Sequence, residues 1–546
     1  MQNEIHKQRL FLGACLSLVA TSVSFAVIGA SMGPLKTQFM LSNLQIGMIG
    51  GANLYGFAIT QLIFSPLCDT LGMKRLLQLA FVGHLLGALS MIFAGGFGLL
   101  YTGALLISMG NGLVEAACNP LVVALYPNDK SVKLNQFHVW FPGGIVIGGV
   151  LSFILDQIGI TAWQVKIGLI LVPTVIYAFL MFRETFPKTE ASAAGVSLSE
   201  AFRETLRAPV VSVGLLMVGM VIMMLNNMGI LQVDAHVVNW LFLGSLVISV
   251  VMGIMAWFAG RKLEVLMLVM LMAMAITASS ELGPGRWVPA VLESGGMHGI
   301  LVLAWINGLM AILRYNAGAF VHRFSPTGTL LISAVLTVVG LYWLSTAASL
   351  VMVLPAATVF AFGVCFFWPT MLGFVSERIP KSGAFGLGLM GAVGMAVTGL
   401  FTAPQMGAIA DQYLHEKLTP TEVMAVVSEV KSTFPALIDQ AQGPIKDEVR
   451  KALDDAEAVE KAFQAEGKLP EGTTASALRE VIAQGGNSDA ATKAKAVLNP
   501  ADNYGGRMAF RAIVPFTALL IIVFGFLYWQ DKKSGGYKVE KLATTS

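Results

Sequence analysis

Apolar runs of about 20 residues recur from one end of this 546-residue chain to the other, and they restrict its fold more than any other feature. A helix of that length crosses the ~30 Å hydrocarbon core of a bilayer. Only 12% of the residues are charged and 55% are hydrophobic, which is about half the charge of a soluble protein. The sequence therefore predicts an all-α polytopic protein embedded in a lipid bilayer.

The apolar runs predict fourteen spans in two halves. An N-terminal half, 1–182, holds six spans, and a cytoplasmic linker, 183–209, follows it. We interpret 210–259 as an inserted transmembrane hairpin that belongs to neither half. The second half has spans seven to eleven within 260–409 and its last span at 509–529, before a tail, 530–546. The expected spans are 10–33, 46–67, 76–96, 100–125, 134–159, 162–182, 210–232, 237–259, 263–291, 299–320, 329–347, 350–374, 384–409 and 509–529.

The polar stretch 410–508 is rich in Ala, Glu, Asp and Lys, and 446–467 has acid–base pairs at helical spacing. We expect a helical insertion of two or three helices there. Basic residues indicate the orientation, because cytoplasmic loops of membrane proteins are rich in Lys and Arg. If both termini are cytoplasmic, the short inner loops are rich in Lys and Arg, whereas the short outer loops hold few basic residues apart from Lys36, Lys166 and Arg286. We therefore expect a multi-pass inner-membrane protein with 410–508 outside the cytoplasm.

Two short basic turns suggest an internal repeat. CDTLGMKR, 68–75, follows the second span of the first half, and VHRFSPTG, 321–328, follows the second span of the second half. Two six-span halves with matching loops are typical of transporters whose site lies between the halves near the midplane.

Glu115 is an acid within an expected span, ten residues before the end of that span at Leu125. It should lie roughly 15 Å from the cytoplasmic edge, near the centre of the bilayer. Acids at such depth are costly, and burial disfavours their charged form, so Glu115 can bind and release a proton near neutral pH. The alternative is a hydrogen-bonded acid that only ties helices together.

Three polar residues accompany Glu115. His138 lies about one turn inside the next span, where it is a candidate for substrate binding, for a proton relay, or for a purely structural role. Asn119 and Asn135 favour helix packing, with substrate contact as the alternative.

The first cytoplasmic turn contains Asp69, Gly72, Lys74 and Arg75. Asp69 is expected to cap the next helix or to pair with a base across the bundle, while Gly72 permits the tight turn. We expect these four residues to act as a gate that stabilises the closed inner face.

In the second half, Gly283, Pro284 and Gly285 interrupt a span beside Glu281 and Trp287. Broken helices at this depth are tolerated where they line a cavity. The other candidates for substrate binding are Asn307, Trp368 and Gln405, whereas Arg314 is expected nearer the cytoplasmic end, with a structural role.

Several of these segments resemble a known family. CDTLGMKR is similar to the loop between spans two and three of the major facilitator superfamily, roughly G-x-L-x-D-x-x-G-R/K-K/R, except that Ser65 or Pro66 replaces its first glycine. Within that superfamily, the chain resembles the fucose/glucose/galactose–proton symporters over the twelve shared spans, but not over 210–259 or 410–508. The segments that carry this resemblance are EAACNP (115–120), KLNQFHVWFPGG (133–144), ELGPGRW (281–287), FFWPT (366–370) and GAVGMAVTGLFTAPQMGAIAD (391–411).

The resemblance implies that Glu115 is the proton-coupling glutamate of span four. His138 and Phe141 occupy positions where the fucose-type members carry amide side chains for the substrate, so the identity of the sugar stays open. The family's aspartate in span one has no counterpart in 20–39. Proton symport, sodium coupling and uniport therefore all remain alternatives.

We predict a secondary transporter that moves a small polar solute, most plausibly a sugar, by alternating access with proton coupling through Glu115. An exporter of the same superfamily and a transporter-like sensor that moves no solute are the alternatives. The chain has no metal-ligand spacing, nucleophile elbow or phosphate-binding loop, so we expect no enzyme activity, cofactor or metal. We also expect a monomer and no nucleic-acid partner.

Overall fold

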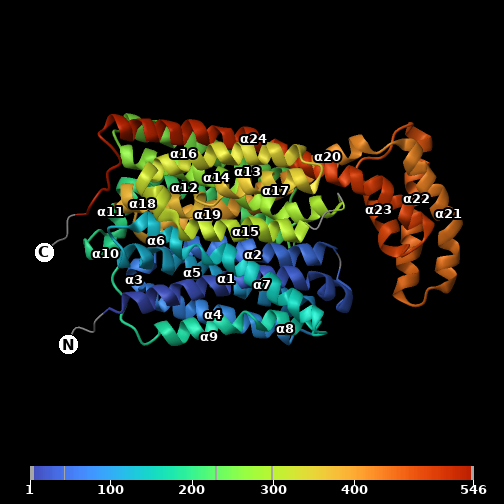
Figure 1. Cartoon of the computed structure of the whole chain (residues 1–546), viewed down its shortest axis with the longest axis horizontal. Coiled ribbons are helices and arrows are strands. Elements are labelled where there is room, and N and C mark those ends of the chain that lie inside the picture. The colour runs from blue at the N-terminus through green and yellow to red at the C-terminus, as the bar shows by residue number, and fades with distance from the viewer. Residues whose placement is uncertain (1–4, 42, 228–229, 295, 297–298, 543–546) are drawn as a thin grey trace.

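The structure is a computed structural model that describes residues 5–41, 43–227, 230–294, 296 and 299–542. The described part is helical and contains no strand. Most helices run side by side in one elongated bundle, and both termini lie at the same end of it (Figure 1). We call this the terminus end and the opposite one the insertion end.

The first half consists of six passages through the bundle. Two of them are broken by a short non-helical stretch, after Phe137 and after Gly168. The passages are α1 (Lys7–Gln38), α2 (Asn43–Phe64), α4 (Met73–Ile92), α5 (Phe97–Leu125), α6 (Lys130–Phe137) with α7 (Trp140–Gln157), and α8 (Trp163–Gly168) with α9 (Leu171–Met181); α3 (Cys68–Leu71) lies between α2 and α4.

The second half also has two interrupted passages. Its helices are α14 (Lys262–Ser294), α15 (Gly299–Tyr315), α16 (Ala317–Thr346), α17 (Leu350–Val364) with α18 (Phe367–Arg378), α19 (Gly383–Val397) with α20 (Ala403–Lys417), and α24 (Asp489–Lys533). A π-helical turn, Thr398–Thr402, joins α19 to α20. Ser325, at φ +64°, turns the chain inside α16, so the second passage of this half continues beyond α15 to that residue.

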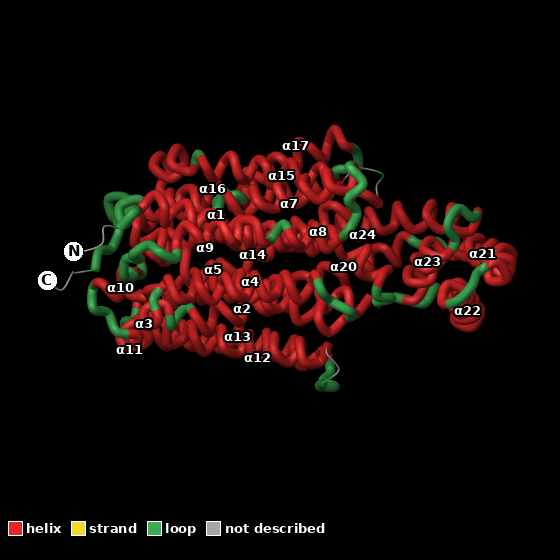
Figure 2. Tube along the Cα trace, turned by 90° about the horizontal axis from the view of Figure 1, so that it is seen from below, coloured by secondary structure: helices red, strands yellow, loops and turns green. Residues whose placement is uncertain are grey.

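The segment between the halves forms α10 (Glu190–Ala193), α11 (Leu198–Ala201), α12 (Arg207–Asn227) and α13 (Ala235–Phe258). Helices α12 and α13 lie side by side at one face of the bundle (Figure 2). Among the described residues, twelve helical stretches are long and apolar enough to cross a membrane, and one of them, 198–222, includes most of α12. The apolar parts of α13 and α15 are shorter, 243–258 and 299–315. That 210–259 is a transmembrane hairpin therefore stays a prediction.

Beyond the bundle, α21 (Pro420–Gln440), α22 (Pro444–Glu466) and α23 (Thr473–Gln484) pack with the first turns of α24 (Figure 1). This outer unit has its own apolar core, which extends from Leu414 to Ala501 and includes Val430, Phe434 and Leu478. The structure has no break at 509, where the sequence predicts the last span to begin. Instead α24 is one helix of 45 residues, because its first turns pack in the outer unit and the rest pack in the bundle.

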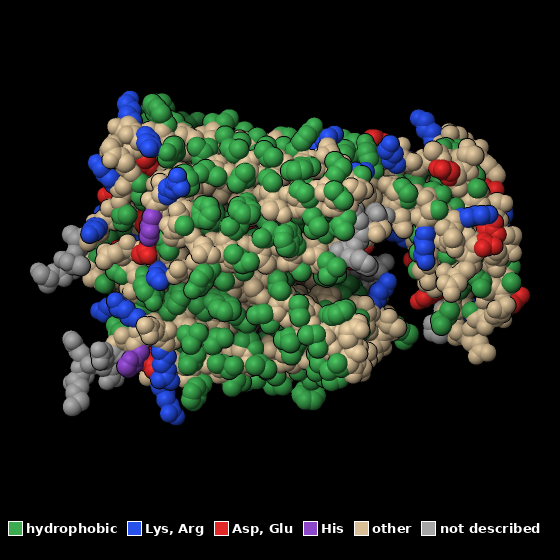
Figure 3. All heavy atoms as spheres, in the orientation of Figure 1, with side chains coloured by type: hydrophobic (Ala, Val, Ile, Leu, Met, Phe, Trp, Pro, Cys, Tyr) green, Lys and Arg blue, Asp and Glu red, His purple; other side chains and the backbone are tan. Residues whose placement is uncertain are grey.

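Hydrophobic side chains cover the middle of the bundle, as a bilayer requires (Figure 3). Lys and Arg gather at the terminus end, and charged side chains of both signs are scattered over the outer unit (Figure 3).

Candidate functional site

A small cavity lies between the two halves of the bundle. Both halves contribute polar and aromatic side chains. The lining residues are Glu115, His138, Phe141, Glu281, Leu282, Arg314, Trp368 and Met395.

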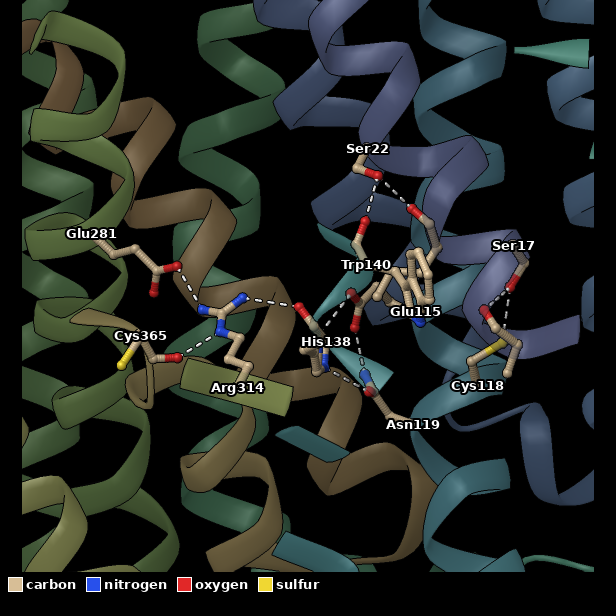
Figure 4. Close-up of polar contacts among 12 residues, drawn as sticks. Ser17, Ser22, Glu115, Cys118, Asn119, His138, Trp140, Glu281, Arg314 and Cys365 are labelled. Carbon is tan, nitrogen blue, oxygen red and sulfur yellow. Dashed lines mark hydrogen bonds and ion pairs between the residues drawn. The ribbon is translucent and has the colours of Figure 1, made fainter. Parts of the chain in front are cut away.

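Glu115, Asn119 and His138 form one connected group on the N-terminal side of the cavity (Figure 4). All three are at least 97% buried. The Asn119 amide donates from Nδ2 to Glu115 Oε2 at 2.5 Å. Its Oδ1 lies 3.1 Å from His138 Nε2, and His138 Nδ1 lies 3.8 Å from Glu115 Oε1. Asn119 is one helical turn after Glu115, so both project from the same face of α5.

Arg314 occupies the opposite wall and contacts both halves (Figure 4). It pairs with Glu281 at 2.9 Å, and it donates to the carbonyl oxygens of Cys365 at 2.5 Å and His138 at 3.1 Å. The sequence-based placement of Arg314 near the cytoplasmic end is wrong. Its passage continues through the first turns of α16, so Arg314 lies well inside the bundle.

Two aromatic side chains form apolar walls. Trp368 begins the first turn of α18 and packs over Gly394, where a Cβ atom would lie 2.8 Å from the indole ring. Phe141 packs edge-to-face on Phe25, with ring centroids 5.8 Å apart. Aromatic faces beside carboxylates suit a solute with both apolar and hydroxyl-bearing surfaces.

Five of the predicted substrate ligands do not line this cavity, namely Asn119, which bonds Glu115 and His138, and four that lie farther away. Asn135 donates to Ser131 O and Thr370 Oγ1 on the terminus side of His138, and Asn307 donates to Leu303 O in its own helix. Trp287 lies six residues beyond Glu281, roughly 9 Å along α14. It packs beside Gly407 of α20, the helix that also carries Gln405. These four residues were candidates because of their residue types, but their positions along and around their helices keep their side chains away from the cavity.

At the terminus end, polar contacts join the halves into a closed barrier. Glu377 Oε1, from α18, accepts from the backbone N–H and the hydroxyl of Ser131, at 3.0 and 2.8 Å, and so caps the first turn of α6. Lys130 donates to Ser376 O at 3.1 Å and to Glu190 at 2.5 Å. Sequence reasoning missed Glu377, because the residue it caps lies 246 positions away.

The predicted gate residues lie beside this barrier. Asp69 accepts from the hydroxyl of Thr189 in the linker. It does not cap α4, which begins after Gly72, and it forms no ion pair with a base among the residues that the structure describes. It also lies against Gly383, the first residue of α19, where a helix dipole favours a carboxylate.

The other residues of that turn differ in exposure. Gly72 has φ +85°, a conformation that favours glycine. Lys74 donates to the carbonyl of Glu184 at 3.1 Å, and Arg75 is exposed.

The burial of Asp69 leads us to expect that the stability of the folded protein depends on pH. Burial raises its pKa above the ordinary value, and the bond from Thr189 acts in the opposite direction. The folded state therefore binds this proton more tightly than the unfolded state, and that stabilisation is lost as pH rises through the raised pKa. Relative to an Asp69→Asn variant, the Tm of the wild type should fall as pH is raised from about 4 towards neutrality. Thermal unfolding in detergent checks this, and parallel curves for the two proteins would contradict it.

No group of three or more His, Cys, Asp or Glu within the described residues is arranged to hold a metal ion. The four cysteines are free and buried.

The sequence pattern of the Major Facilitator Superfamily matches residues 10–280. Among curated proteins, the chain is 25% identical over 180 residues to a cis,cis-muconate transport protein of Acinetobacter baylyi, covering 32% of this chain and 41% of that protein. It is 24% identical over 151 residues to a D-xylose transporter of Levilactobacillus brevis, covering 28% and 33%. The chain thus spans well under half the length of these relatives.

Solved structures share the fold over a larger part of the chain. The proton:xylose symporter XylE bound to 6-bromo-6-deoxy-D-glucose matches with a TM-score of 0.55 at 15% identity, covering 74% of this chain and 89% of that one. The transporter FucP in its outward conformation matches with a TM-score of 0.51 at 17% identity, covering 74% and 92%.

Proposed function

We propose that this chain belongs to the major facilitator superfamily, whose pattern matches residues 10–280, and that it carries a small neutral sugar together with protons by alternating access. The observation that carries the proposal is the buried group of Glu115, Asn119 and His138, which faces a cavity between the halves. The finer resemblance to the fucose/glucose/galactose–proton symporters belongs to this proposal.

The charges of the cavity favour a neutral solute. Arg314 is the one side chain with a fixed positive charge among the described lining residues. Glu281 balances its charge at 2.9 Å, and two more of its donors are directed to backbone carbonyls, which weakens its attraction for an anion. A dicarboxylate such as muconate would also meet the carboxyl groups of Glu115 and Glu281. This argues for a sugar, the kind of solute named for the xylose relative, over the solute named for the muconate relative.

Acceptors and aromatic faces are the groups that bind sugar hydroxyls and ring faces. Within the described part of the chain, Glu281 Oε2 is buried without a hydrogen-bond partner, and Glu281 lines the cavity, so this oxygen can accept from a hydroxyl. Trp368, on the same side, offers a face for the ring. We propose Glu281, Trp368, Phe141 and Asn119 as the substrate contacts, with Asn135, Trp287, Asn307 and Gln405 bordering the path rather than the central site.

The orientation of Asn119 supports a proton relay. Since its Nδ2 donates to Glu115, its Oδ1 accepts from His138 Nε2–H. In neutral His138 this leaves Nδ1 as an acceptor that faces Glu115 Oε1 at 3.8 Å. Protonated Glu115 can then pass its proton to His138 after a small approach of the two groups.

We further propose an inner-membrane monomer with the terminus end in the cytoplasm and the outer unit outside. Basic side chains at the terminus end support this orientation. Asp69, Gly72, Lys74 and Arg75 would then act, with the contacts between Glu377 and Ser131, in closing the cytoplasmic face.

Transport in right-side-out vesicles tests the proposal. An imposed inward proton gradient should drive accumulation of labelled D-xylose or D-glucose, whereas muconate should not accumulate. Accumulation that follows a sodium gradient instead would refute proton coupling. Expulsion of the label under the proton gradient would support the exporter alternative.

We expect the outer unit to be a domain that can be removed without loss of transport. Because it has its own core, replacing 419–487 by a short Gly/Ser linker should leave sugar flux within about twofold of wild type. The deletion keeps the contact of Gly505 with Ala410, which joins α24 to α20. Flux is measured alongside the amount of folded protein in the membrane. Loss of flux in a folded variant would show that the unit takes part in transport, and flux in the intact protein would exclude the sensor alternative.

A further inference from the structure

Two carbonyl groups beside the cavity lack their usual helical donor. The residue four positions after His138 is Pro142, and the residue four positions after Cys365 is Pro369. Proline has no N–H, so neither carbonyl can accept the ordinary i+4 hydrogen bond. At both positions the helix is interrupted, between α6 and α7 and between α17 and α18. A buried carbonyl without a donor is costly.

Arg314 supplies a donor to each of these carbonyls. Its Nη1 donates to His138 O at 3.1 Å, and the same carbonyl also accepts a long bond of 3.4 Å from Phe141 N. Its Nε donates to Cys365 O at 2.5 Å. The two acceptors belong to different halves, so one side chain from α15 holds the broken helices of both.

The interruptions carry the side chains of the proposed site. His138 lies at the first one, Phe141 follows it by three residues, and Trp368 follows Cys365 by three. All three side chains line the cavity. Whatever fixes the two interruptions therefore fixes the positions of these side chains.

Glu281 balances the positive charge of the Arg314 guanidinium. It pairs with Arg314 Nη2 at 2.9 Å, and Arg314 is 98% buried. A buried guanidinium needs such a counter-ion. The planar fork of arginine spreads its donors over three nitrogen atoms and so reaches three separate acceptors, whereas a lysine carries all its donors on one nitrogen.

We propose that Arg314 is the positioning residue of this site, holding the proline-interrupted helices of both halves in register through the carbonyls of His138 and Cys365. It acts on the substrate through His138, Phe141 and Trp368 rather than by touching it. The claim that Arg314 positions the substrate rests on the proposed function, whereas the claim that it holds the two carbonyls by hydrogen bonds does not.

A cycle of variants tests the hydrogen-bonding part without any substrate. Arg314→Met with Glu281→Gln removes both charges and leaves the two carbonyls without donors, so the Tm of the purified protein should fall. Adding Pro142→Ala and Pro369→Ala restores the missing N–H groups and should recover more than half of that loss. The same two alanines in the wild-type background should not raise Tm, because Arg314 already bonds those carbonyls. An equal effect of the alanines in both backgrounds would overturn the assignment.

Counterflow of labelled D-xylose or D-glucose tests positioning. Arg314→Lys keeps the charge beside Glu281 but cannot reach both carbonyls, so KM should rise about tenfold or more with a smaller change in Vmax. The four-substitution variant is assessed by Tm alone, because its Glu281→Gln change also alters a proposed substrate contact. An unchanged KM in Arg314→Lys would refute positioning. Absence of sugar transport in the wild type would instead refute the proposed function and leave the Tm cycle valid.

Discussion

Replacing Glu115 by Gln should abolish accumulation of the sugar while exchange of labelled for unlabelled sugar persists. Gln keeps the size of the side chain and can still bond Asn119, but it cannot carry a proton. A driving force of 100 mV is worth about 2.3 kcal/mol per charge, or roughly 40-fold accumulation for one proton. We expect the inside-to-outside ratio to fall from about that value to about 1, measured in right-side-out vesicles under an imposed proton gradient.

Glu264 offers a matched control for this experiment. Glu264 lies in the second half and, like Glu115, is buried. It accepts from the backbone N–H of Ala208 at 2.8 Å, forms an ion pair with Arg261 at 2.7 Å, and does not line the cavity. Glu264→Gln should therefore lower stability without changing the accumulation ratio per folded molecule. A Glu115→Gln protein that still concentrates sugar would remove Glu115 from the coupling mechanism.

Replacing Glu377 by Ala should open the terminus end of the bundle. The substitution removes two hydrogen bonds to Ser131 and one from Tyr537 at 2.7 Å. The bonds to Ser131 join the two halves and exist only while this end is closed. Loss of a helix cap costs about 0.5–2 kcal/mol, and bonds to a charged group contribute somewhat more. We expect the equilibrium to shift towards the inward-open state by about tenfold or more.

Cysteine labelling from the terminus end measures this shift. Val123 lines a small cavity between α5, the linker and the second half. In a protein whose four native cysteines are replaced by Ala, a Val123→Cys reporter should react about tenfold faster with an impermeant maleimide in inside-out vesicles once Glu377 is Ala. Glu184→Ala is the control, because Glu184, at the start of the linker, pairs at 3.0 Å with Arg9 of the first half rather than with the second half. Equal labelling rates in the two variants would show that Glu377 does not hold the barrier closed.

The relation between Glu115 and His138 illustrates what local sequence can predict. Glu115 and Asn119 are one turn apart on one helix, so their hydrogen bond follows from helical periodicity. His138 was a candidate because it is a titratable group inside an apolar run. That its ring reaches Asn119, 19 positions away, depends on how α6 packs against α5.

Arg314 illustrates what local sequence cannot predict. Its depth was misjudged because its passage includes the start of α16, and the turn comes only at Ser325. Pro142 and Pro369 are visible in the sequence as residues that free a carbonyl. Which side chain bonds those carbonyls depends on contacts between residues that are 176 and 51 positions apart in the sequence.

The sequence by itself determined that this protein is a bundle of membrane-length helices, that Glu115 lies within it, and that the polar stretch before the last span is helical. Those properties follow from hydrophobicity and helical period, which are local. Only the tertiary structure decided which polar residues share the central cavity, which ones close the terminus end, and that Arg314 joins the two halves. Those contacts depend on the packing of helices that are distant in the chain, and no residue pattern within one helix specifies its partner in another.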